Sequence, residues 1–124
     1  MLGNFQQSEL RIEVPATANT IRDRLLSPSS LTKWLFPQQM SFPTQDLLAT
    51  GTKFQASFGP IVLGYQVERV DNQCLRLLLS QSIDGYHEWY WGEGWVQSRL
   101  EGISLLPLNL HQTTMLLRLR TALK

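Results

Sequence analysis

Three of the four tryptophans fall within one short segment, residues 86–95, with the sequence YHEWYWGEGW. Alternating side chains followed by a glycine-rich turn signal are typical of a β-hairpin. A two-residue turn at Glu93-Gly94 fixes the register, because facing residues of an antiparallel pair are counted outward from the turn. One face of this hairpin then carries His87, Trp89, Trp91, Val96, Ser98 and Leu100.

The two faces of the predicted hairpin differ in chemistry. On the outer face Glu88 lies opposite Arg99 and Tyr90 opposite Gln97, which are pairings suited to a solvated surface. The inner face mixes large aromatic side chains with the small residues Ser98, Gly102 and Ser104. Small residues among large ones leave room that a packed core would fill. We therefore expect a pocket for a hydrophobic ligand on the inner face.

Composition excludes several classes of protein. A chain of 124 residues predicts one domain, residues 1–124, and 43% hydrophobic with 17% charged residues predicts a folded one. The formal net charge of +1, without a dense run of Lys and Arg, gives no basic surface for nucleic acid or anionic membrane. No apolar run approaches the roughly 20 residues of a membrane-spanning helix.

Cysteine and histidine usage also limits the chemistry. Cys74 is the only cysteine, so it cannot form an internal disulfide, and the first residues lack the pattern of a secretory signal. We therefore expect a cytoplasmic protein. His87 and His111 stand far apart in the sequence and give no known metal-ligand spacing, so we expect neither a metal nor a cofactor.

The first part of the chain predicts one strand and two short helices. Residues 5–14 alternate between apolar and polar, as in a half-buried strand. Thr17 is a candidate N-cap for a helix that stops at Ser27, and Ser27 is a candidate cap for a second helix with Trp34 on its buried side. Residues 37–50 contain two prolines and little periodicity, and we expect a long loop there.

After Gly51 the chain reads as a run of strands with turns at Gly59-Pro60 and at residues 71–73. For the next connection Asp84-Gly85 is the favoured two-residue turn signal, but it would set Trp89 on the face opposite Leu79. We therefore prefer a three-residue turn, residues 83–85, or a bulge with the same effect, because it keeps the apolar residues of both strands on one face. That register pairs Gln81 with His87, Leu79 with Trp89 and Leu77 with Trp91. The residues expected to face the interior together are Phe54, Leu63, Tyr65, Leu77, Leu79, Trp89, Trp91 and Leu100.

The last segment fits both a strand and a helix. As a strand, the side chains of residues 115–120 would point alternately to the two faces of the sheet. As a helix, one face carries Gln112, Met115, Leu116, Leu119, Ala122 and Leu123. We prefer a helix over residues 109–123, since Pro107 precedes it and Asn109 is a candidate cap.

This order of elements resembles a known family. The residues that carry the resemblance are LRIEVPA at 10–16, LLSPSSLTKW at 25–34, GTKF at 51–54 and VERVD at 67–71. They are similar to the START-like helix-grip (SRPBCC) superfamily, which includes the birch-pollen-allergen relatives and the polyketide cyclase/dehydrase proteins.

The resemblance implies an α+β helix-grip fold. A curved antiparallel sheet of about six strands would carry two short helices after its first strand and a C-terminal helix packed across it, with a hydrophobic cavity between. The family commonly has a seventh strand before a longer final helix, whereas residues 109–124, if helical, leave room here for six.

Three functional hypotheses follow. The first is binding or carriage of a hydrophobic small molecule, such as a lipid, isoprenoid, pigment or polyketide, in that cavity. The second is an enzyme of the cyclase/dehydrase kind, in which His87 and Tyr65 act on a bound carbonyl compound. The third is a non-catalytic protein with a filled core that binds a protein partner.

The candidate sites have simpler explanations too. A lone histidine without a nearby Asp, Cys or Ser partner is more often a hydrogen-bonded core residue than a catalytic one, and clustered tryptophans are more often core than pocket. We therefore predict no catalytic residue. The predicted ligand-binding residues are Trp34, Phe54, Leu63, Tyr65, Leu79, Gln81, His87, Trp89, Trp91 and Ser98.

Overall fold

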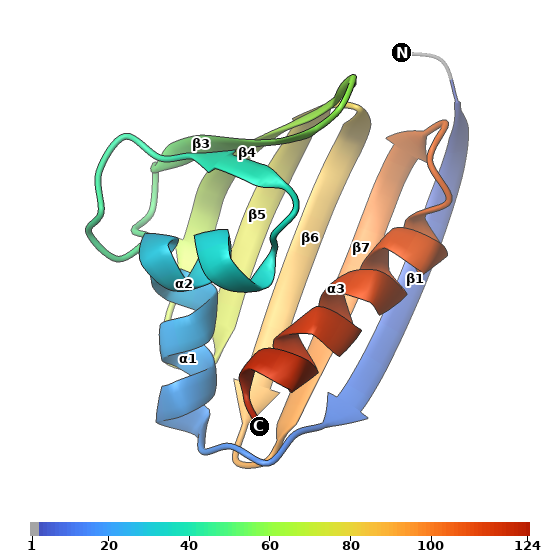
Figure 1. Cartoon of the computed structure of the whole chain (residues 1–124). Coiled ribbons are helices and arrows are strands. Elements are labelled where there is room, and N and C mark those ends of the chain that lie inside the picture. The colour runs from blue at the N-terminus through green and yellow to red at the C-terminus, as the bar shows by residue number, and fades with distance from the viewer. Residues whose placement is uncertain (1–2) are drawn as a thin grey trace.

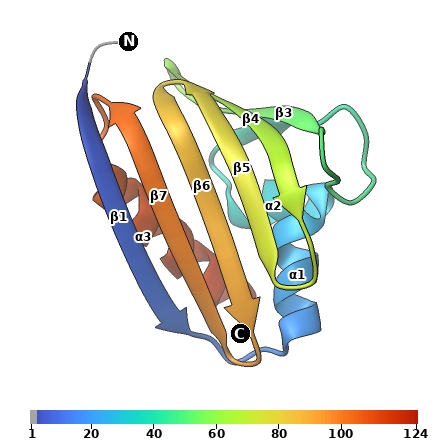
Figure 2. The same ribbon diagram turned by 180° about the vertical axis from the view of Figure 1, so that it is seen from behind.

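A computed structural model describes residues 3–124 and contains one antiparallel sheet in the strand order β1-β7-β6-β5-β4-β3-β2. The three helices lie on one face of this curved sheet (Figure 1), and the view from behind shows the opposite face uncovered (Figure 2). The elements in chain order are β1 (Asn4–Glu13), α1 (Ala18–Leu26), α2 (Pro28–Trp34), β2 (Gln39–Ser41), β3 (Lys53–Phe58), β4 (Ile61–Val70), β5 (Cys74–Gln81), β6 (Ile83–Gly92), β7 (Trp95–Ser104) and α3 (Leu108–Ala122).

The aromatic hairpin has the predicted register. Gly92 pairs with Trp95 across the Glu93-Gly94 turn, so that Trp89 faces Ser98 on the inner side. Gly94 has φ +78°, a conformation that glycine adopts without steric cost. The predicted outer pairs, Glu88 with Arg99 and Tyr90 with Gln97, are also confirmed.

The β4–β5 hairpin has the predicted pairing near the core but a different turn. Tyr65 faces Leu79 and Val67 faces Leu77, as expected, whereas Val70 pairs with Leu75. The register shifts between Val67 and Arg69, which makes Glu68 a bulge residue. The turn between Val70 and Leu75 has one residue more than predicted, and the bulge on β4 compensates for it. Glu68 still reaches Arg76, with 2.6 Å between Oε1 and Nε.

The predicted turn at residues 83–85 is wrong. Leu79 pairs with Gly85, Leu77 with His87 and Leu75 with Trp89, a slip of four residues from the predicted pairs. Because side chains alternate with a period of two, a slip by an even number of residues leaves Leu77, Leu79 and Trp89 on their predicted face.

Two local features explain the different β5–β6 connection. Ser82 is tied to β4, since its N–H donates to the Val62 carbonyl and its hydroxyl accepts from the Val62 N–H. Gly85 is a strand residue opposite Gly102, and a Cβ there would lie 1.9 Å from the carbonyl oxygen of Glu101. The glycine that resembled a turn signal therefore permits a close approach of two strands.

Residues 37–50 are not entirely a loop, and the sheet has seven strands rather than about six. Gln39–Ser41 form β2, which pairs with Ser57, Ala56 and Gln55 of β3 at the edge of the sheet. Three residues are too few to show an alternating pattern in the sequence, so this strand could not be read from periodicity.

The predicted helices are confirmed, with one exception in the capping. The hydroxyls of Thr17 and Ser27 accept from backbone N–H groups at the starts of α1 and α2. Asn109 does not cap α3; the Leu108 N–H instead donates to Oε1 of Gln6, on β1. A side chain from a distant strand thus satisfies the first turn of α3, which no local pattern could reveal.

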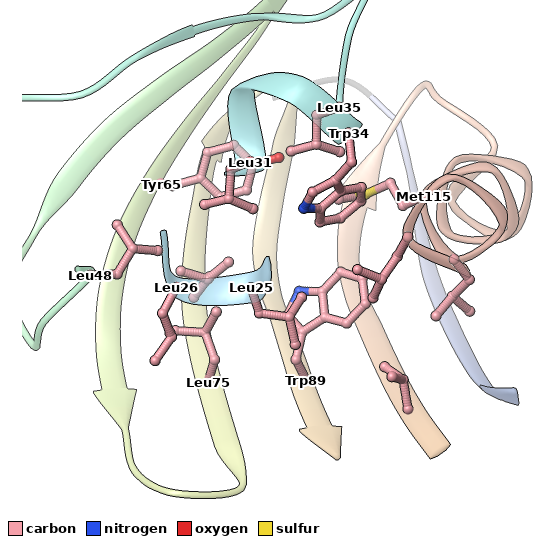
Figure 3. Packing of buried hydrophobic residues seen from close by; sticks show 14 of the residues in the cluster. Leu25, Leu26, Leu31, Trp34, Leu35, Leu48, Tyr65, Leu75, Trp89 and Met115 are labelled. Atoms are coloured by element: carbon pink, nitrogen blue, oxygen red, sulfur yellow. The ribbon is translucent and has the colours of Figure 1, made fainter. Parts of the chain in front are cut away.

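The core forms between the sheet and the helices. All eight residues predicted to face the interior together are buried, and so are Met115, Leu116 and Leu119 of α3. The indole rings of Trp34 and Trp89 meet edge to face, with centroids 6.4 Å apart, and Figure 3 shows this pair beside Leu25 and Met115. Within residues 3–124, no helix is long and apolar enough to cross a bilayer.

Replacing Leu119 with Ala tests the packing of α3. Leu119 has no exposed surface, so the substitution should lower the free energy of unfolding by about 2–5 kcal/mol. Leu117→Ala on the same helix is the matched control; that side chain is 54% exposed and its loss should cost less than about 0.5 kcal/mol. Equal costs in chemical denaturation would contradict this orientation of α3.

Candidate functional site

The space between the sheet and the helices is almost filled. The remaining cavity measures about 20 Å³, room for about one water molecule. Four predicted ligand-binding residues contribute to its lining, and they contact one another or the helices, as Figure 3 shows for three of them. These four are Trp34, Phe54, Tyr65 and Trp89.

A buried polar network occupies the space beside the small residues of β7. The hydroxyl of Ser98 lies 2.5 Å from Nε2 of His87 and accepts from Nε2 of Gln112 at 3.0 Å. The Gln112 amide also donates to the carbonyls of Ser98, at 2.8 Å, and Ser8, at 3.1 Å. The room expected beside Ser98 is therefore filled by a side chain from α3.

The network also accounts for the other polar end of Gln112. Its Oε1 accepts from the Ser8 hydroxyl at 2.5 Å, and the Ser8 hydroxyl accepts from Nδ2 of Asn109 at 3.1 Å. Buried polar groups are costly when unpaired and stabilising when each has a partner. This chain of hydrogen bonds therefore holds α3 at one position on β1 and β7.

His87 is buried as a neutral side chain. Burial lowers the pKa of His87 from its ordinary value of 6.5 to about 3, with a smaller contribution from His111. The ring also stacks on Trp89, with centroids 4.5 Å apart. A neutral imidazole between Ser98 and an indole is suited to a structural role.

Tyr65 is buried at a different place. Its ring stacks on Phe54, with centroids 4.7 Å apart and planes at 6°, and burial raises the pKa of its hydroxyl well above the ordinary value. Tyr65 lines the interior cavity of about 20 Å³, whereas His87 does not.

A larger cleft lies at the side of α3, where this helix faces the β3–β4 hairpin. Its volume is about 270 Å³, near the lower end of the range for small-molecule sites. We call it the α3 cleft, and its lining comprises Leu35, Pro37, Gln38, Ala56, Ser57, Phe58, Ile61, Leu63, Leu106, Pro107, Leu110, His111, Thr114 and Arg118.

The two walls of the α3 cleft differ. The wall from β3 and β4 is largely apolar, with Ala56, Phe58, Ile61 and Leu63. The α3 wall presents three polar side chains at a spacing of three and four residues, which places them on one side of the helix: His111, Thr114 and Arg118. An apolar chamber with a few polar groups on one side is typical of a small-molecule site.

The electrostatics of the polar wall come from two residues. Burial lowers the pKa of His111, which favours its neutral form. Arg118 is partly buried and donates from Nη1 to the carbonyl of Phe36, in the segment between α2 and β2. Its guanidinium is thereby held beside the cleft.

The structure distributes the remaining predicted site residues over several places. Leu63 lines the α3 cleft, while Leu79 and Gln81 line an open groove of about 540 Å³ over β3, β4 and β5. Gln81 is exposed and has φ +72°, so its predicted place on the inner face is wrong. Among the described cavities, none has His87, Trp91 or Ser98 in its lining.

Sequence reasoning missed the polar residues of the α3 cleft. His111, Thr114 and Arg118 flank the buried stripe of the predicted helix, and their common side could have been identified from their spacing. The opposing wall could not, because Ala56 and Ile61 belong to strands that are distant from α3 in the sequence. Within the described part of the chain, no group of three or more His, Cys, Asp or Glu side chains is placed to hold a metal ion.

Comparison with solved structures identifies the fold. A Chromobacterium violaceum protein, CV1439, is similar with a TM-score of 0.76 and 16% identity over 95% of this chain and 97% of that one. DynU16, from the dynemicin biosynthetic locus, has a TM-score of 0.69 and 16% identity over 93% of this chain but 46% of its own. Norcoclaurine synthase from Thalictrum flavum, in complex with dopamine and hydroxybenzaldehyde, has a TM-score of 0.67 and 13% identity over 96% and 86%.

These likenesses agree with the family resemblance of the sequence. No protein-family model and no curated protein matches the sequence. The chain has a helix-grip fold, with a curved antiparallel sheet and a C-terminal helix across it.

Replacing Gln112 with Leu tests the buried network. The change removes the amide that donates hydrogen bonds to Ser98 and Ser8, so it should lower the free energy of unfolding by about 2–4 kcal/mol. Gln97→Leu makes the same replacement on the outer face, where Gln97 donates to Glu9, and should cost less than about 0.5 kcal/mol. Similar midpoints for the two variants in urea would show that the network does not hold α3.

The pH dependence of stability tests the state of His87. An unfolded histidine titrates near 6.5 and the folded one near 3, so the unfolded state binds the additional proton between these values. The free energy of unfolding should therefore fall as the pH is lowered from about 6.5, by up to about 1.4 kcal/mol per pH unit.

The slope of stability between about pH 6.5 and pH 5 is measured in wild type and in His87→Gln, above the range in which carboxylates titrate. His87→Gln should flatten the slope, whatever its effect on stability at neutral pH. His111→Gln is the comparison, because burial also lowers the pKa of His111, and it should flatten the slope less since that residue is only partly buried. An unchanged slope in His87→Gln would exclude a buried neutral histidine.

Proposed function

We propose that this protein binds a hydrophobic small molecule in the α3 cleft. The observation that carries the proposal is the contrast between the interior cavity beneath α3 and the α3 cleft at its side. The interior cavity measures about 20 Å³, whereas the α3 cleft measures about 270 Å³ and has a largely apolar wall. A ligand held between the sheet and α3 therefore has room at the side of the helix rather than beneath it.

The lining of the α3 cleft supports this proposal. Leu63 and Ala56 form a buried floor, and Phe58 and Leu110 at the rim are both more than half exposed. Covering exposed apolar side chains gains about 25 cal/mol per Å² of apolar surface removed from water. Apolar surface at a concave site therefore favours an apolar ligand.

A protein of the same fold also supports small-molecule binding. Norcoclaurine synthase is described in complex with dopamine and hydroxybenzaldehyde, two small aromatic molecules. The fold can thus hold compounds of this size, although identity of 13% carries no residue of that site over to this chain.

The catalytic alternative, with His87 and Tyr65 acting on a bound carbonyl compound, has less support. Their side chains lie in different surroundings, and the hydrogen bond of His87 is made to Ser98. The alternative of a protein-binding module gains support from the filled interior and from the exposed side chains of Phe36 and Leu117. We also expect a cytoplasmic location, since Cys74 is a free cysteine.

Thr114→Phe tests the α3 cleft directly. Thr114 is exposed on the cleft wall, so a phenyl ring would enter the open space without overpacking the core. A neutral environment-sensitive dye such as Nile red should bind the wild type, with a melting temperature that rises with dye concentration. The variant should weaken that binding at least about tenfold, a change of about 1.4 kcal/mol.

Thr121→Phe is the matched control, because Thr121 is also exposed on α3 but lines the outer groove with Lys33 and Phe36 instead of the cleft. Its dye affinity should equal that of the wild type. Equal dye affinity of Thr114→Phe and the wild type would show that the dye binds outside the α3 cleft. Absence of binding in the wild type would reject small-molecule binding and favour the protein-binding module.

A further inference from the structure

We infer that the ligand of the α3 cleft is an apolar molecule with a single anionic head group, and that Arg118 binds this head group. The inference rests on the proposed function, since it names the class of ligand for the same site. It is carried by the charge of the lining, by the guanidinium of Arg118, which forms no ion pair within residues 3–124, and by the division of the cleft into an apolar and a polar wall.

Arg118 supplies the only charge in the lining. The other thirteen lining residues have no ionised side chain at neutral pH, because His111 is kept neutral by the lowering of its pKa. The segment Leu108–Ala122 that forms α3 contains no Asp or Glu. The cleft therefore has a positive potential that is not balanced by a carboxylate in its wall.

The guanidinium of Arg118 is positioned but retains free donors. Its one hydrogen bond among the described residues is to the Phe36 carbonyl, a neutral acceptor. Within residues 3–124 it forms no ion pair, in contrast to Arg24, Arg69, Arg76 and Arg99. An arginine has five N–H donors in a planar fork that matches a carboxylate, so several remain for a ligand.

Arg118 lies at the border of the cleft rather than on its floor. It lines both the α3 cleft and the outer groove formed with Lys33 and Phe36. A head group on Arg118 would thus stay partly hydrated while the apolar body extends over Leu63 and Ile61. This arrangement avoids the large cost of burying an isolated charge.

His111 and Thr114 extend the polar wall from Arg118 towards the N-terminal end of α3. Neither side chain forms a hydrogen bond within the described residues, in contrast to the neighbouring Thr113, whose hydroxyl donates to the Asn109 carbonyl. A neutral imidazole offers one donor and one acceptor. These two groups suit a neutral polar substituent on the ligand, which leaves the charge to Arg118.

Three probes of equal chain length separate this inference from the proposed function: decanoate, decanol and decyltrimethylammonium, used below their micelle concentrations. Each competes with Nile red for the wild-type protein. Decanoate should bind about tenfold more tightly than decanol, and decyltrimethylammonium more weakly than decanol. The preference for decanoate should decrease with added salt, because the partly exposed charge pair is screened.

Arg118→Gln should remove the preference for decanoate while the affinity for decanol stays within about twofold of the wild type. Arg120→Gln, an exposed arginine of the same helix outside the cleft lining, is the matched control and should keep the preference. Arg118→Lys should retain part of it, since the charge remains and the planar fork is lost.

The outcomes distinguish the two proposals. Equal affinity for decanoate and decanol in the wild type, or a preference that persists in Arg118→Gln, would overturn the inference and leave small-molecule binding in the cleft intact. Nile red binding that no probe displaces would overturn the inference alone, whereas absence of binding by Nile red and by every probe would overturn both. A loss of decanol binding in Arg118→Gln, with the fold retained by circular dichroism, would assign Arg118 to the shape of the cleft and so contradict its role as the head-group site.

Discussion

The hydrogen bonds of the Gln112 amide determine how the rest of this structure is arranged. They connect α3 to the backbone of β1 and β7 and to the Ser98 hydroxyl, which in turn contacts His87. A buried amide that loses such partners is costly, so α3 has one preferred position and rotation on the sheet. That position directs Leu119 into the core and His111, Thr114 and Arg118 towards the β3–β4 hairpin.

The position of α3 accounts for both the closed interior and the open cleft. With α3 fixed over β7 and β1 (Figure 1), Met115 and Trp34 close the space above Trp89, and only about 20 Å³ remains. The β3–β4 hairpin is joined to the rest of the sheet through β5 and does not pack fully against α3. The largely apolar cleft between them is therefore the place where the fold offers room for a ligand.

The fold could be predicted from local patterns, whereas the cleft depends on contacts between distant segments. Alternation and turn residues identified the Glu93-Gly94 hairpin and the inward face of the sheet, because the four-residue slip between β5 and β6 is even and keeps the apolar side chains on the inner face. The three-residue strand β2 and the capping of α3 by Gln6 have no local signature. Ser98 resembled a gap because its partner, Gln112, comes from another element.

The central claim is that a ligand binds at the side of α3 and not beneath it. Nuclear magnetic resonance during a titration with decanol tests this claim, since methyl and indole signals report on the two places separately. The account predicts shifts of the methyl groups of Leu63, Ile61 and Leu110, with the indole signals of Trp34 and Trp89 unchanged. Large shifts of those two indole signals, with little change at Leu110, would contradict it and place the ligand in the interior.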